Sequence, residues 1–330
     1  MLIRKRTRYS LLLMLALVAA LIVALVLRKT APPEAARLLP ESDAIVYANL
    51  KPLRAATHFD RNQIQRSPEY QRFIDATGIV PERDIDAVAF ALHRMEDPNG
   101  PNGPVGYSEV FEGRFDGERL AAYLATIATA KETYDGHTVF TIPVGDGKAL
   151  RPFRIAQLGY DTIAASNMPT EEQIHSILDR HRAAASPFSG SSLLSARYRD
   201  VPLLSSVWAI GHIGLPFSDR GYISLFGLRL PLSEDTTFVA SLRYVAGLHL
   251  RIEEIAPSDD EAAHTAASLN TLLGLFKSLQ QAQPRASNDA ALLQMTNSIE
   301  IEQHKDRTIL TANIPTDLLK QLTAATTPMP

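Results

Sequence analysis

The chain contains no cysteine, and neither charge is in large excess. Without cysteine it has no thiol to carry a lipid anchor, and it fits an oxidising compartment, where proteins without disulfides are also common. The formal net charge of −3 argues against a nucleic-acid partner, because such a partner favours a basic surface. These absences exclude a lipoprotein and disfavour a protein that binds nucleic acid.

The common catalytic and cofactor signatures are missing as well. The nine histidines are scattered and form no His-Glu-x-x-His zinc motif. No Gly-x-Ser-x-Gly turn is present to expose a serine nucleophile. Gly145 and Gly147 lack the third glycine and the helix of a dinucleotide-binding loop, so they predict a simple turn. The sequence therefore indicates neither a cofactor nor a catalytic residue.

Apolar residues dominate the start of the chain. Four cations lie among the first eight residues, and an uninterrupted apolar run then extends from Leu11 to Leu27. At about 1.5 Å per residue the run spans roughly 25 Å, near the lower limit for a membrane-spanning helix. It is longer than the apolar region of a typical signal peptide, and no small-x-small cleavage site follows it. Residues 1–28 therefore predict a cytoplasmic tip and a transmembrane signal-anchor, with a cleaved signal peptide as the alternative.

The flanking charges predict the orientation of this anchor. More cations precede the run than follow it, where only Arg28 and Lys29 are found, so the N-terminus should stay in the cytoplasm. We therefore predict a single-pass protein of the inner (cell) membrane. Its contact with the lipid bilayer is the run from Leu11 to Leu27, and residues 40–330 are periplasmic or otherwise extracytoplasmic. Residues 29–39 include two adjacent prolines and predict a short, stiff linker.

Two similar segments indicate an internal duplication. Residues 161–170 resemble residues 307–316, with Thr, Ile, Asn, Pro and Thr recurring in register. Ile155 and Gln157 recur at the same separation as Ile301 and Gln303. Each copy is typical of a strand, a tight turn, a second strand and a helix that begins at Pro-Thr. The match predicts that Ile163 and Ile309 lie on the same face of equivalent strands.

The patterns around these segments predict the fold class. In residues 248–253, Leu and Ile alternate with His, Arg and Glu, which predicts a strand with one buried face and one wet face. Asp116 can cap a helix in the first copy, and Ser258 or Asp259 can cap one in the second. We predict an α+β protein: an N-terminal transmembrane helix followed by two similar antiparallel-sheet-and-helix subdomains, residues 40–185 and 186–325.

One polar helix face is a candidate metal site. Glu171, His175 and Asp179 follow one another at four-residue intervals, so their side chains should line one face of a helix. Carboxylates and imidazole are ligands for divalent cations. A single helix supplies few ligands, however, and a solvated polar face is the ordinary interpretation of such a pattern. We therefore expect no metal ion there.

A second candidate is an apolar stretch at residues 215–232. Its large side chains include those of Phe217, Tyr222, Leu225 and Phe226. One interpretation is a short core helix with its loop. The other is an exposed patch that binds a partner, lipid or the other copy.

Three phrases carry a resemblance to a known family. They are residues 77–88 (TGIVPERDIDAV), 113–120 (GRFDGERL) and 206–211 (SVWAIG). They resemble a family of bacterial membrane-anchored proteins, frequent in acidobacteria, with a duplicated α+β ectodomain, and the likeness runs from about Leu39 to Leu322. That family has no assigned activity. The resemblance therefore implies an exported location and the duplication, but no functional residue.

Together these features predict a membrane-anchored exported protein. We expect a non-enzymatic binding or scaffold protein of the cell envelope, whose partner is an envelope protein or a hydrophobic ligand. One alternative is an envelope hydrolase, which could be metal-dependent through the Glu171, His175 and Asp179 face. The other is a purely structural tether.

Overall fold

The computed structural model has an α+β fold built on one large antiparallel sheet, so the predicted fold class is confirmed in its coarse form. The structure describes residues 31–61, 66–100, 103–145, 150–183, 189–212, 222–225, 228–231, 235–244, 247–282 and 289–315, and also Met14. No helix among these residues is long and apolar enough to cross a bilayer. The predicted anchor, from Leu11 to Leu27, lies outside the described residues except for Met14.

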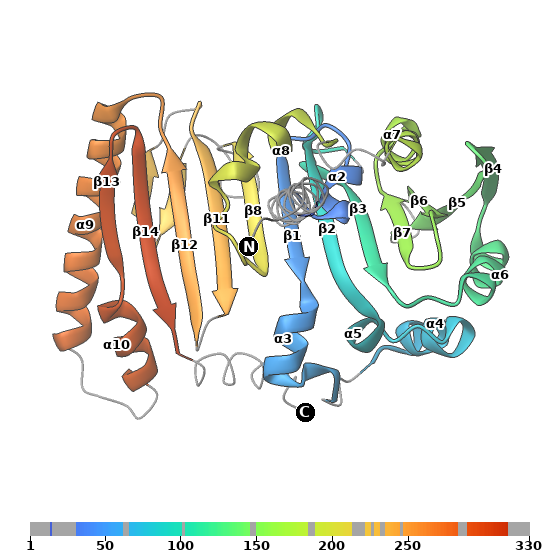
Figure 1. Cartoon of the computed structure of the whole chain (residues 1–330), viewed down its shortest axis with the longest axis horizontal. Coiled ribbons are helices and arrows are strands. Elements are labelled where there is room, and N and C mark those ends of the chain that lie inside the picture. The colour runs from blue at the N-terminus through green and yellow to red at the C-terminus, as the bar shows by residue number, and fades with distance from the viewer. Residues whose placement is uncertain are drawn as a thin grey trace, which may run out of the picture.

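The sheet has twelve strands and runs across the whole width of the molecule (Figure 1). From one edge to the other its order is β13 (Glu300–His304), β14 (Arg307–Ile314), β12 (Leu248–Ile255), β11 (Thr237–Tyr244), β8 (Val207–His212), β1 (Ala44–Asn49), β2 (Ile85–Arg94), β3 (Val105–Gly113), β7 (Thr162–Ser166), β6 (Arg151–Gln157), β5 (His137–Val144) and β4 (Ala130–Tyr134). A separate hairpin contains β9 (Tyr222–Leu225) and β10 (Leu228–Pro231). Because β1 pairs with β8, the two predicted subdomains share one sheet instead of forming two.

One face of the sheet carries three short helices over the main core. They are α2 (Glu34–Leu38), α7 (Glu172–Arg182) and α8 (Ser192–Arg197). Alanines on β2 leave room for α2 to approach the sheet closely, and Ala35 and Leu38 of that helix are buried. At the β1–β8 seam, the rings of Tyr47 and Trp208 stack with centroids 5.4 Å apart. The seam is thus part of the core.

The opposite face carries α6 (Gly117–Ile127) near one end and α9 (Asp259–Ala282) near the other. Asp116 accepts a hydrogen bond from the backbone N–H of Arg119 at 3.1 Å, and Ser258 accepts one from Glu261 at 3.3 Å. These bonds satisfy backbone donors that the first turn of a helix leaves free. The predicted caps Asp116 and Ser258 are therefore confirmed.

The remaining helical elements connect these layers. They are α3 (Leu50–Thr57), η1 (Phe59–Arg61), α4 (Pro68–Thr77), α5 (Pro81–Asp84), η2 (Tyr198–Asp200) and α10 (Asp289–Asn297). The tight turn between β4 and β5 has positive φ at Asp135 (46°) and Gly136 (80°). Such angles suit the right-handed twist of a hairpin. The Asp-Gly pair is typical of such a turn, and here it joins β4 to β5.

Strand pairing contradicts the predicted equivalence of Ile163 and Ile309. Ile163 pairs with Phe111 and packs with Leu120 beneath α6. Ile309 pairs with Glu253, and the successive partners across the sheet are Val239, Ile210 and Ile45. Paired residues share a face of the sheet, and Ile45 is on the face that α2 covers. Ile309 therefore lies on the opposite face from Ile163, and the prediction is wrong. The segments differ by one residue in register, which turns every side chain to the other face.

Thr308, next to Ile309 in β14, faces α9. Its hydroxyl donates to the backbone carbonyl of Ala262 at 2.8 Å, and its side chain is buried. Counted outward from the seam between β1 and β8, strands β7 and β14 are each the fourth strand. The correspondence is therefore one of strand order, and the gapless sequence match does not describe it.

Candidate functional site

Helix α7 carries the three residues of the predicted metal site, and each has a different partner. Glu171 accepts a hydrogen bond from Arg154 at 2.7 Å. A backbone hydrogen bond and this arginine hold the pKa of Glu171 below its ordinary value. His175 Nε2 lies 2.8 Å from Glu132 Oε1 on β4. The imidazole ring of His175 stacks on the ring of Tyr134, also on β4, with 3.8 Å between the centroids.

Asp179, one turn further along, accepts a hydrogen bond from the Tyr134 hydroxyl at 3.2 Å. On the polar face of α7, His175 and Asp179 therefore contact the edge strand β4, and Glu171 contacts Arg154 on β6. In the part of the chain that the structure describes, no three His, Cys, Asp or Glu side chains are grouped so that they could hold a metal ion. On the other side of α7, Ile174, Ile177 and Leu178 are buried, as their spacing predicts.

Metal binding by this face can be tested directly. We expect calorimetric titration of the protein with zinc or manganese to show no specific site, because each candidate ligand already has a protein partner. His175→Ala provides the comparison. Micromolar binding that disappears in this variant would contradict the prediction.

The predicted apolar patch falls largely outside the described residues. Phe217 and Phe226 lie outside them, and Tyr222 and Leu225 are the two ends of β9. Strand β9 pairs only with β10 among the described strands, so this hairpin is separate from the large sheet. The role of the patch stays a prediction.

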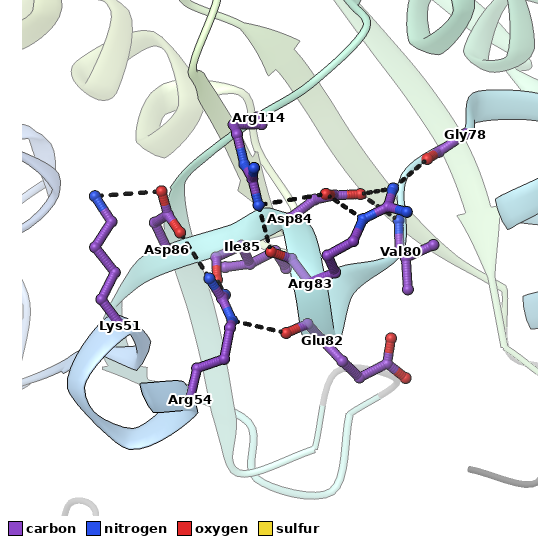
Figure 2. A network of polar contacts seen from close by, with 10 residues as sticks. All are labelled: Lys51, Arg54, Gly78, Val80, Glu82, Arg83, Asp84, Ile85, Asp86 and Arg114. Carbon is purple, nitrogen blue, oxygen red and sulfur yellow. Dashed lines mark hydrogen bonds and ion pairs between the residues drawn. The ribbon is translucent and has the colours of Figure 1, made fainter. Parts of the chain in front are cut away.

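A cluster of arginines and aspartates surrounds the start of β2, and sequence reasoning did not find it. Figure 2 shows Asp84 at its centre. Arg83 donates to both Asp84 carboxylate oxygens, at 2.8 and 2.7 Å, and the backbone N–H of Val80 donates at 2.8 Å. Burial alone would raise the pKa of Asp84, but these bonds outweigh it and hold the pKa below its ordinary value. Asp84 therefore stays ionised and is already fully engaged.

Asp86, two residues further along, is paired in the same way. Arg54 donates to its carboxylate at 2.9 Å, and Lys51 lies 3.2 Å away (Figure 2). Arg54 also donates to the backbone carbonyls of Glu82 and Ile85. Burial would raise the pKa of Asp86, but Arg54 and Lys51 hold it below its ordinary value. These contacts join α3 and α5 to the sheet.

A hollow of about 530 Å³ lies next to this cluster. Its charged lining residues are Arg83, Arg114, Arg119, Asp84, Asp116 and Asp161. Three cations face three anions, so the net charge favours neither an anionic nor a cationic ligand. Arg119 is also occupied, because it donates to the backbone carbonyls of Asp75 and Ala76 at 2.8 and 3.1 Å.

A buried histidine and two serines form the second group that sequence reasoning missed. His93 Nε2 lies 3.2 Å from Ser108 Oγ, which lies 3.1 Å from Ser166 Oγ. Burial lowers the pKa of His93, and the charge of Asp43 only partly opposes it. Both serines are fully buried, so a substrate cannot reach either hydroxyl in this structure. Only the register of β2, β3 and β7 brings these residues together.

A third group corrects the predicted wet face of β12. Glu253 is only 2% exposed. It accepts hydrogen bonds from Arg251 at 2.5 Å and from Arg307 on β14. Arg307 also donates to Asp200 of η2 at 3.0 Å, and Glu253 and Asp200 raise the pKa of the Arg307 guanidinium. Glu253 is buried because arginines from its own and a neighbouring strand pair with it.

Glu109 on β3 is the exception to this pairing. It is 7% exposed and makes no hydrogen bond or ion pair with any residue that the structure describes. It lies between Phe90 and Ala165 in the register of the sheet. Burial raises its pKa to about 7. No local pattern identifies this residue, because its charge is only unusual once the neighbouring strands are in place.

No family model and no curated protein matches the chain. Among solved structures, it is similar to crystal form III of a protein named TP0453, with a TM-score of 0.46, 10% identity, and coverage of 89% of this chain and 99% of that chain. Crystal form I of the same protein gives 0.46, 11%, 89% and 98%. Similarity at this level transfers no function. The family resemblance of the three sequence phrases stays a prediction.

Proposed function

We propose that the chain is a single-pass, membrane-anchored protein of the cell envelope with a non-enzymatic binding or scaffold role. The anchor rests on the apolar run from Leu11 to Leu27 and on the excess of cations before it. The chain enters the folded body only a few residues after the run, because Ala35, Ala36 and Leu38 of α2 are buried. Residues 40–330 then lie outside the cytoplasm.

The pairing of acidic and histidine side chains is the observation that carries the non-enzymatic role. A general base or nucleophile must be open to substrate and lie within hydrogen-bond reach of the group with which it reacts. The polar partners of Glu171, His175, Asp179 and Asp84 are Arg154, Glu132, Tyr134 and Arg83, and none of these partners is a serine, threonine, cysteine or lysine that the acid or imidazole could activate. The hollow beside Asp84 contains three cationic and three anionic side chains, and Asp84 itself is held by Arg83 and Arg114. The titration with zinc and manganese tests the metal-dependent form of the hydrolase alternative.

We propose further that the body is an internal duplication. Outward from the central seam, the strand orders are β1-β2-β3-β7-β6-β5-β4 in one direction and β8-β11-β12-β14-β13 in the other, so the proposal matches the first five strands of each half. A helix follows β3 and another follows β12, and α6 and α9 pack on the same face of the sheet. This order supports the proposal independently of the gapless identities, whose register the strand pairing contradicts.

The predicted topology can be tested with reporter fusions to the full chain. We expect alkaline phosphatase fused to the C-terminus to be active in cells, because that enzyme folds only outside the reducing cytoplasm. Green fluorescent protein at the same position is the matched control and should be dark. An inactive phosphatase with a fluorescent counterpart would overturn the proposed location.

A further inference from the structure

Two adjacent leucines project from the loop between η2 and β8. Leu203 is 64% exposed and Leu204 is 86% exposed. Leu204 has a φ of 65°, a left-handed conformation that is uncommon for a residue with a side chain. The backbone N–H of Ser205 donates to Pro202 at 3.3 Å and its hydroxyl donates there at 2.6 Å, which close the turn. The turn therefore holds two large apolar side chains in solvent.

This loop lies beside the point where the chain enters the folded body. A hollow of about 500 Å³ is lined by the loop, by Tyr198 and Leu194, and by Pro32. Pro32 is the fifth residue after the apolar run, and five extended residues span at most about 18 Å. If the run crosses the bilayer, Pro32 and the loop are held close to the bilayer surface.

The chemistry of the loop suits that surface. Arg199 lines the same hollow, is exposed, and forms no ion pair within the part of the chain that the structure describes. Leucines that enter the boundary between headgroups and acyl chains, next to a cation that meets anionic headgroups, are typical of interfacial membrane contacts. The occupant of this surface is thus a phospholipid bilayer containing anionic lipid.

We propose that residues 199–205 form a second, interfacial membrane contact that orients the folded body on the bilayer. The inference rests on the proposed anchor, since only the anchor brings this loop to lipid. A site of this kind takes lipid headgroups and the upper part of the acyl chains. The contact would turn one face of the sheet toward the membrane. This is the face that α2 and α8 cover.

The absence of cysteine allows a clean test with single labels in the full chain. We would introduce Leu204→Cys, attach a nitrobenzoxadiazole dye, and reconstitute the protein in vesicles of phosphatidylethanolamine and phosphatidylglycerol. The matched control is Leu279→Cys, an exposed leucine on α9, which packs on the opposite face of the sheet. Lipids with a nitroxide high on the acyl chain should quench the Leu204 label at least twofold more than the Leu279 label.

A third label separates failure of this inference from failure of the anchor. Ala19→Cys lies within the apolar run and should be quenched by a nitroxide deep in the acyl chain. If that label is quenched and the Leu204 label behaves like the Leu279 label, the interfacial contact is wrong and the anchor stands. If the Ala19 label is not quenched, the anchor is wrong and the inference falls with it.

Two further outcomes would also overturn the inference. Shielding of the Leu204 label from iodide in detergent, rising with protein concentration, would identify a second copy as the occupant.

Adding Leu203→Asp should lower the quenching of the Leu204 label at least twofold, because a carboxylate disfavours the boundary between headgroups and acyl chains. Unchanged quenching would show that the dye itself enters the lipid. Both leucines are exposed, so these changes leave the core intact.

Discussion

Replacing Glu109 with glutamine is expected to stabilise the folded protein at pH 8 by about 3 kcal/mol and to change its stability little at pH 4. Burial raises the pKa of this carboxyl from an ordinary value of 4.5 to about 7. A raised pKa in the folded state means that folding favours the protonated acid. The wild-type protein should therefore lose stability as the pH rises from about 4.5 to about 7, and glutamine removes this loss.

The measurement is denaturant unfolding of the full chain in detergent at pH 4, 6 and 8, followed by circular dichroism. Glu69→Gln is the matched control, because Glu69 on α4 is exposed. It should shift stability by less than about 0.5 kcal/mol at every pH. If Glu109→Gln has the same effect at pH 4 and pH 8, the carboxyl is not protonated preferentially in the folded protein.

Replacing Arg307 with methionine is expected to destabilise the protein by about 3 kcal/mol, the lower end of the range for a broken buried ion pair. The substitution leaves buried Glu253 with Arg251 as its one remaining cation, and it removes the 3.0 Å contact to Asp200. Methionine keeps most of the side-chain volume, so the loss reports the charge. Chemical unfolding at pH 7 provides the measurement.

A double-mutant cycle identifies the cause of this loss. Adding Glu253→Leu removes the uncompensated carboxylate and should restore at least half of the lost stability. Arg72→Met is the control, because Arg72 and its partner Glu69 form an exposed ion pair whose contribution is small. If Arg307→Met costs no more than Arg72→Met, the buried network does not stabilise the fold.

Features that depend on neighbours within a few residues follow directly from the sequence. The cap at Asp116 needs only the backbone N–H three residues later. The hairpin turn needs Asp135 and Gly136, and the buried face of α7 needs three apolar residues at helical spacing. Each of these is a local property of the chain, which is why spacing and residue type suffice to predict it.

The strand register required the tertiary structure. Ile163 and Ile309 lie in segments with the same local pattern, yet their pairing partners are Phe111 and Glu253, more than 50 residues away in each case. A shift of one residue in the pairing register leaves the local sequence pattern unchanged. It moves every side chain of the strand to the opposite face of the sheet. The repeated identities therefore could not show which side chains face a helix.

The candidate sites divide in the same way. Sequence spacing places Glu171, His175 and Asp179 on one helix face, but Arg154, Glu132 and Tyr134 become their partners only through the sheet. The alternation of apolar and polar residues in β12 predicts that Glu253 faces solvent. In the structure Glu253 is paired with Arg307, which lies 54 residues further along the chain. Such partners are invisible in the local sequence.

Composition and local spacing were enough for the coarse α+β class, the helix caps and the hairpin. They suffice because they depend on hydrophobicity and on backbone groups close in the chain. The tertiary structure decided the single shared sheet, the ion pairs of buried Asp84, Arg154 and Glu253, and the lack of such a pair at Glu109 among the described residues. Those outcomes depend on which strands are neighbours, and electrostatic energy depends on distance in space, not on separation along the chain.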